Sequence, residues 1–264
     1  MKKFITLFIS TLSLLSCSNE SKDNINSKKI QKVVFYKNSS NARHWNFTND
    51  LLKNITLADG TLAEEFIYDN KNRVVSNIIY TNGVATETNI ITYNTDNTIK
   101  SINGLDYAFD TTTQTYTYSY SGTFTITCQV NSDKLAVNYT RTGSNAGEYH
   151  LVYTNGNMIS FEKSTNGTTD LLKNFHFDGT YGNNPIADAV LPVARIKSLT
   201  DPSFFIDNHT SKEMPNGFDK GITSPYYFNY GLIPGTALSQ IGIEVLDSNN
   251  NFVDFYSFAD YYYQ

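Results

Sequence analysis

The chain has 264 residues, a formal charge of −5 at pH 7 and a sequence pI near 5.3. It is acidic and lacks a Lys/Arg cluster, which argues against nucleic-acid binding, because phosphates need a basic face. Aromatic residues make up 14% of the chain, enough for a folded core. Tyr, Phe and Thr are abundant and strong helix formers are scarce, so the composition favours an all-β fold.

The first sixteen residues have the pattern of a bacterial export signal. Lys2 and Lys3 precede an apolar run that begins at Phe4, and small or apolar residues lead to Cys17. The run is shorter than the ~20 apolar residues that a comfortable membrane span needs. A basic head, an apolar core and a small residue before the cleavage point are typical of a secretory signal. We therefore predict a signal peptide over residues 1–16.

Leu14-Leu15-Ser16-Cys17 resembles the lipobox of bacterial lipoproteins. The resemblance implies cleavage before Cys17 and acylation of that cysteine, which would anchor the chain to a membrane. The alternative is an ordinary signal peptide with an incidental cysteine. Residues 17–29 are polar and lack aromatics, which predicts a flexible tether. Ser18 stands where an Asp marks inner-membrane retention in well-studied lipoproteins, so the resemblance points to the outer membrane, facing the periplasm or the cell surface.

Residues 30–264 are predicted to form one β domain built from serial hairpins. An aromatic strand end, a polar turn and a new apolar strand recur along the chain, most clearly at Tyr68–Val75, Tyr93–Ile99 and Tyr153–Ile159. Asn-Gly pairs favour primed two-residue turns, and they occur at Asn82-Gly83, Asn155-Gly156 and Asn166-Gly167. Strands of about 6–10 residues between such turns predict an antiparallel meander that curls into a barrel or half-barrel.

Alternation within the strands predicts which side chains are buried. Tyr116, Tyr118 and Tyr120 share one strand face, and the residues between them carry hydroxyl groups, as in a sheet with one face in water. Trp45 falls in the register of the recurring tyrosines, so we expect it in the core. Cys128 lies on an apolar face and would have no disulfide partner if Cys17 is lipidated, so we interpret it as a small buried hydrophobe.

Residues 186–225 break this rhythm. Prolines punctuate the segment, and its two apolar runs are long enough for a helical turn or two. We expect an irregular insertion here. A long connection of this kind can be a lid or a plug, but a crossover loop that packs on the end of the barrel is the favoured interpretation.

No catalytic, cofactor-binding or metal-binding residues are predicted. The sequence has no P-loop, no G-x-G-x-x-G and no G-x-S-x-G. The four histidines, which lack metal-ligand spacing, are His44, His150, His176 and His209. We expect His176, between two phenylalanines, to be exposed. The stretch Asp247–Asp254 partly matches a calcium loop, but it lacks the glycine and the closing glutamate, so a hairpin turn is favoured.

Paired carboxylates are the chemistry of glycoside hydrolysis. Glu64 and Glu65 are adjacent, so on a strand they would point to opposite faces. Asp201 and Asp207 form the other candidate pair.

Tyr68-Asp69 through Arg73-Val74 resembles the YD-type repeat of bacterial surface and toxin-shell proteins, with Asn72 in place of the usual Gly. Phe177–Pro185 approximates a Tyr-Asp-x-x-x-Asn-Pro element with extra residues. Together with the lipobox and the serial hairpins, these motifs resemble uncharacterised Bacteroidetes lipoprotein domains of porin-like fold. The resemblance spans about residues 30–264 and implies a β-meander curling toward a barrel, without a particular activity.

The features above predict an envelope lipoprotein that acts as a non-catalytic binding module or scaffold. Its expected partners are the membrane, through the lipid, and a glycan or an envelope protein. The alternatives are a glycan-binding accessory protein and a carbohydrate-acting hydrolase that uses carboxylates of the 186–225 segment. A membrane-spanning barrel is disfavoured, because the strands look shorter than the 9–11 residues that a span needs and Thr and Asn occur throughout.

Overall fold

The computed structural model describes residues 29–37, 39–177, 179, 183–220, 224–232, 238–246 and 252–263. The predicted signal peptide, the lipobox with Cys17 and nearly all of the tether lie outside these residues. Most of the calcium-like loop and part of the Phe177–Pro185 element also lie outside them.

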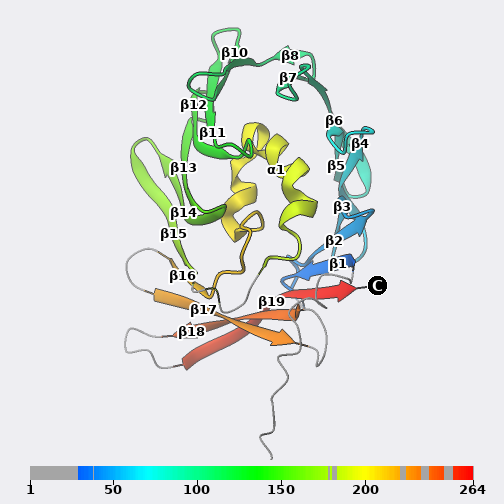
Figure 1. Ribbon diagram of the computed structural model, residues 1–264, viewed down its shortest axis with the longest axis vertical. Coiled ribbons are helices and arrows are strands. Elements are labelled where there is room, and N and C mark those ends of the chain that lie inside the picture. Colours follow the sequence, from blue (N-terminus) through cyan, green and yellow to red (C-terminus); the bar gives the residue numbers. More distant parts are fainter. Residues whose placement is uncertain are drawn as a thin grey trace, which may run out of the picture.

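Most of the described chain is β-strand, and two helical segments interrupt the series (Figure 1). The strands before the helices are β1 (Ile30–Phe35), β2 (Arg43–Thr48), β3 (Leu51–Leu57), β4 (Leu62–Tyr68), β5 (Val74–Thr81), β6 (Val84–Tyr93), β7 (Ile99–Ile102), β8 (Leu105–Asp106), β9 (Ala108–Asp110), β10 (Thr115–Tyr120), β11 (Phe124–Val130), β12 (Ala136–Gly143), β13 (Gly147–Thr154), β14 (Asn157–Thr165) and β15 (Thr168–His176). The helical segments are α1 (Ala187–Thr200) and the 3-10 helix η2 (Pro202–Asp207). The remaining strands are β16 (Gly217–Lys220), β17 (Ser224–Leu232), β18 (Leu238–Leu246) and β19 (Phe252–Tyr263).

The strands pair antiparallel with their neighbours in sequence, and the first strand closes on the last. Val33 of β1 lies opposite Trp45 of β2 on one side and Tyr261 of β19 on the other. The segment 105–110 pairs with β7 through its first half and with β10 through its second half, and no ladder joins β8 to β9. The predicted all-β meander is therefore confirmed. It curls into a ring without forming a continuously hydrogen-bonded barrel (Figure 1).

Two kinds of turn connect the strands. All three predicted Asn-Gly pairs form two-residue turns with positive φ at both residues, as a type I′ turn requires. Four longer turns share a second geometry, in which the first residue donates its N–H to the carbonyl of the fifth and accepts from the fourth. These turns span residues 57–61, 69–73, 94–98 and 131–135. Asp69 and Asn131 reinforce them, because their Oδ1 atoms accept two further backbone N–H groups each.

Successive turns of a meander fall at alternate ends of its strands, so the ring has two different ends. The end that carries turns 69–73, 94–98, 131–135 and 155–156 is called the plug end below. The opposite end, called the far end, carries turns 82–83, 103–104, 121–122, 143–146 and 166–167.

The α1 helix lies inside the ring (Figure 1) and packs against β3 and β5 on one wall and β11 and β12 on the other. Residues 187–216, here called the plug, thus occupy the interior. This corrects the favoured interpretation of a crossover loop on the barrel end, and the helix has 14 residues instead of a turn or two. Pro192 lies within it and removes one helical hydrogen bond, but burial against two walls outweighs weak local propensity.

The core follows the predicted alternation. Tyr116 and Tyr118 are buried on the inner face of β10, while Thr117 and Ser119 on the outer face are exposed. Trp45 and Cys128 are buried as expected. The buried side chains of α1 are Ala187, Val190, Val193, Ala194, Ile196, Lys197, Ser198 and Leu199. They include nearly the whole apolar set of the helix, so it is apolar on more than one face, as a helix enclosed by walls requires.

Candidate functional site

The densest group of buried polar side chains joins the end of η2 to the wall. Asp207 is the last residue of η2, and its Oδ1 lies 3.1 Å from the Nζ of Lys173 on β15. The Tyr36 hydroxyl donates to the other carboxylate oxygen of Asp207 at 2.8 Å. Lys173 also donates to the Ile206 carbonyl at 3.0 Å. Burial would raise the pKa of Asp207, but Lys173, His209 and the Tyr36 hydroxyl outweigh it and hold that pKa below its usual range.

His209 follows η2 and is enclosed by aromatic rings. Its ring centroid lies 4.5 Å from that of Trp45, 4.7 Å from Phe35 and 6.0 Å from Phe204. Burial lowers the pKa of His209 to about 4; nearby Asp207 acts in the opposite direction, and Lys173 adds to the lowering. The imidazole is therefore neutral at pH 7.

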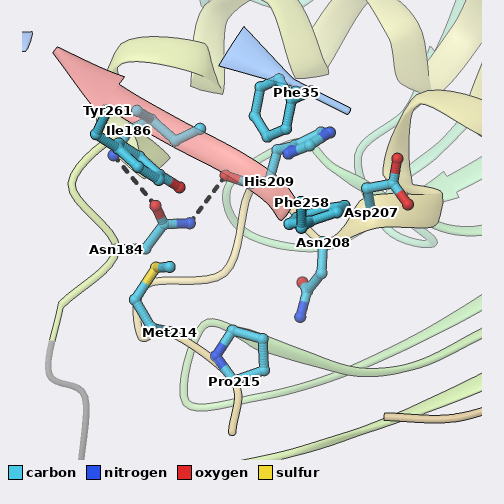
Figure 2. Close-up of a pocket in the computed structure, with 10 residues that line it drawn as sticks. All are labelled: Phe35, Asn184, Ile186, Asp207, Asn208, His209, Met214, Pro215, Phe258 and Tyr261. Carbon is cyan, nitrogen blue, oxygen red and sulfur yellow. Dashed lines mark hydrogen bonds between the residues drawn. The ribbon is translucent and has the colours of Figure 1, made fainter. Parts of the chain in front are cut away.

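Amide and hydroxyl groups attach the next residues of the plug to the turn between β13 and β14. The Met158 N–H donates to the Ser211 hydroxyl at 2.7 Å, and that hydroxyl donates to Asn208 Oδ1 at 2.5 Å. Asn208 Nδ2 donates back to the Met158 carbonyl at 3.3 Å. Figure 2 shows Asn184 accepting from the Ile186 N–H and donating to the His209 carbonyl. These bonds satisfy buried polar groups and hold the plug in one position.

A small cavity lies among these residues (Figure 2). Its lining consists of Phe35, Asn184, Ile186, Asp207, Asn208, His209, Met214, Pro215, Phe258 and Tyr261. The centre of a water molecule can occupy about 20 Å³ of it, which is room for roughly one water. Pockets for small-molecule ligands are ~300–1,000 Å³, so this cavity is too small for a substrate.

A buried ion pair joins α1 to the opposite wall. Lys197 Nζ lies 2.5 Å from Glu64 Oε1 on β4, and Asn77 Nδ2 donates to the same oxygen at 2.8 Å. Glu65 points the other way, toward Lys53 at 3.1 Å and the Tyr80 hydroxyl at 3.3 Å. The prediction that the two glutamates face opposite sides of a strand is confirmed, and Glu64 serves as the partner of a lysine.

The remaining candidate residues do not converge. Asp201 is exposed beyond α1, whereas Asp207 is held by Lys173. His176 is exposed, as predicted, and so is His150, while His44 is half-buried. Within the part of the chain that the structure describes, no three His, Cys, Asp or Glu side chains gather as a metal ion would require. Nor does any helix in that part have the length and apolarity to cross a membrane.

Sequence reasoning did not identify the two lysines that hold the plug. Both carry a signal that could have been found. Lys173 lies on the strand face of buried Phe175, and Lys197 lies one helical turn after Val193 on a buried face. A lysine at a core position is rarely buried without a partner. Each of them therefore predicts a buried acid, although not which one.

Comparisons with known proteins identify similar folds but no function for the chain. No family model and no curated protein matches the chain. Among solved structures, it is similar to a porin-like protein from Bacteroides uniformis ATCC 8492, with 9% identity over 89% of this chain and 96% of the other and a TM-score of 0.37. A porin-like protein from Bacteroides vulgatus ATCC 8482 shares 12% identity over 73% of this chain and 98% of the other, with a TM-score of 0.27. At these values neither likeness bears on function, and the fold assignment rests on the strand pairings.

Proposed function

We propose that the protein is a lipid-anchored scaffold or binding protein of a bacterial envelope, attached through Cys17 and without catalytic activity of its own. The observation that carries the proposal is the plug. A ring whose interior holds its own helix, fixed to both walls by buried bonds, has no lumen for transport near the plug end. The resemblance to porin-like Bacteroidetes lipoprotein domains, with its YD-type hairpins, agrees with this proposal.

One arc of the outer surface, formed by β10–β14, favours attachment by a lipid over insertion of its strands. One cross-strand row on the outside of β10–β14 consists of Thr117, Thr127, Thr140, Glu148 and Ser164. The next row consists of Gln129, Asn138, His150 and Glu162. A wall that faces lipid carries an apolar band instead. This arc is therefore suited to water, and a separate anchor is needed to hold the protein at a membrane.

The hydrolase alternative is less well supported. The two best-placed acids of the interior, Glu64 and Asp207, are each bound to a lysine. The pKa of Asp207 is held below its usual range, which does not suit a proton donor, and the Glu64 carboxylate already binds Lys197 and Asn77. We infer the outer membrane as the location, on the basis of Ser18 in the lipobox resemblance.

The anchor is tested by expressing the full chain in a bacterium with an alkyne-labelled fatty acid. We expect label on the wild type and on Cys128→Ala, and none on Cys17→Ala, which should leave the membrane fraction. Cys128→Ala is the matched control because it removes the other cysteine of the chain. Absence of label from the wild type, or a Cys17→Ala variant that stays in the membrane fraction, would contradict the proposal.

A further inference from the structure

The exposure of aromatic side chains on the inner wall differs between the two ends of the ring. Along the inner face of β10, Tyr116 is 2% exposed, Tyr118 is 7% exposed and Tyr120 is 46% exposed. Tyr116 lies near the plug end of β10 and Tyr120 near its far end, so burial along this face is lost toward the far end. Aromatic side chains of the inner wall thus reach solvent at the far end.

Around Tyr120 the rings form a stack. Tyr120 lies opposite Phe124 across the β10–β11 hairpin, and the two rings are stacked with centroids 5.6 Å apart and planes 24° apart. Arg141 places its Cζ 4.1 Å from the centroid of Phe124. Tyr118 meets Phe124 edge-on at 5.9 Å. These four residues, Tyr118, Tyr120, Phe124 and Arg141, are here called the far-end patch.

The polar groups of the far-end patch define what it can bind. The Tyr118 hydroxyl is buried and has no hydrogen-bond partner among the described residues, a rare state for a buried polar group. Arg141 uses Nε to donate to the Ser144 carbonyl at 2.9 Å, which leaves its Nη groups as donors. The patch therefore combines an uncovered apolar ring face with a guanidinium that can hydrogen-bond a ligand, and with a covered hydroxyl that still lacks a partner among the described residues.

We propose that the far-end patch binds a neutral carbohydrate, with a pyranose ring stacked on Tyr120, sugar hydroxyls bonded to Arg141, and the Tyr118 hydroxyl reached when the bound sugar displaces the side chains that cover it. A sugar ring has an apolar C–H face and a rim of hydroxyls, which matches both halves of the patch. An apolar peptide side chain would cover Tyr120 but would not use the hydrogen-bonding capacity of the Arg141 guanidinium. A polyanion is disfavoured because the chain carries a net charge of −5. The inference deepens the proposed binding function by naming the ligand class.

The test is calorimetric titration of the full chain, purified in a detergent without a sugar head group, with cellohexaose, maltohexaose, laminarihexaose and mannohexaose. We expect at least one of them to bind. Tyr120→Ala should weaken that binding by roughly tenfold, in line with the ~1–3 kcal/mol that a stacking aromatic ring contributes when it binds a nucleic-acid base. Tyr120→Phe keeps the ring and should bind like the wild type. Tyr262→Ala is the matched control, because Tyr262 is 41% exposed on β19 and should leave binding unchanged.

Tyr118→Phe separates binding from folding. The hydroxyl has no partner among the residues that the structure describes, so its removal should leave the melting temperature the same or higher while binding weakens several-fold. Failure of all four sugars to bind would overturn the inference, as would equal weakening by Tyr120→Ala and Tyr262→Ala. Labelling of Cys17 is an independent readout. If the protein is labelled but binds no sugar, the carbohydrate proposal is contradicted and the lipid anchor is not. If it binds sugar but carries no label, the lipid anchor is contradicted and the carbohydrate proposal is not.

Discussion

The two ends of the ring are built from the same strands but differ in what covers them. At the plug end, a Cβ added to Gly156 would lie 2.5 Å from the side chain of Lys212, and the Gly156 carbonyl accepts the Lys212 N–H. At the far end, a Cβ added to Gly104, Gly122 or Gly167 would meet nothing within 4 Å. The strands alone therefore do not decide which inner side chains are buried. The plug contributes to that burial near one end, while Tyr120 at the other end stays 46% exposed.

The largest loss of stability at the plug end is expected from removing one partner of its buried ion pair. Lys197→Met leaves Glu64 buried without a counter-charge, and we expect the free energy of unfolding to fall by about 3–5 kcal/mol. Denaturant titration measures the change. Adding Glu64→Gln should restore most of the loss, because no uncompensated charge then remains.

A control for this variant comes from the surface. Lys29 and Asp50 form an ion pair at 2.7 Å, with side chains 62% and 61% exposed. Lys29→Met should cost less than about 1 kcal/mol. A Lys197→Met variant no worse than Lys29→Met would show that the plug does not depend on the pair.

The pH dependence of stability tests the aromatic enclosure of His209. Its pKa of about 4 lies below the ordinary value of 6.5, so as the pH falls through 6.5 the unfolded chain binds a proton that the folded chain does not. Stability is therefore full above pH 6.5 and falls toward pH 4, by about 3 kcal/mol in total at ~1.4 kcal/mol for each pKa unit.

The same measurement on two variants isolates this contribution. His209→Phe should remove it and flatten the curve between pH 6.5 and 4, whereas the exposed control His176→Phe should retain the wild-type slope. Asp207, whose pKa is lowered, adds a separate loss of stability below its ordinary pKa of 3.8. An unchanged slope in His209→Phe would contradict the burial of the imidazole.

A smaller effect is expected where the plug meets the β13–β14 turn. Ser211→Ala removes the acceptor of the buried Met158 N–H, and leaving that donor unsatisfied should cost about 1–3 kcal/mol. Thermal unfolding measures the loss. Ser119→Ala is the comparison on the exposed outer face of β10, where the change should stay within about 0.5 kcal/mol.

The smallest effect compares one glycine from each end. Gly156 has φ +83° and Gly167 has φ +76°, so alanine is strained by a similar amount at both, about 1–2 kcal/mol. Gly156→Ala should lose more stability than Gly167→Ala, because Lys212 must also move. Equal losses of unfolding free energy in denaturant titration would mean that the Lys212 side chain moves aside at no cost and that its contact with this turn is not tight.

Local sequence patterns predicted much of the fold, namely the turns and the buried positions of the strands. Asn-Gly pairs specify primed turns through their tolerance of positive φ, and alternation placed Trp45 and Cys128 in the core before any contact was known. The candidate site was less accessible to sequence reasoning. Glu64 and Lys197 are 133 positions apart, and Lys173 and Asp207 are 34 apart. Neither pairing can be read from spacing, because the register of a curled sheet brings these residues together.

What the amino-acid sequence determined by itself is the antiparallel meander, since turn chemistry and strand alternation act between residues close along the chain. The tertiary structure alone decided that residues 187–200 form a helix within the ring. Helical propensity across Pro192 is weak, and only burial against two facing walls, each assembled from distant strands, makes that conformation the stable one.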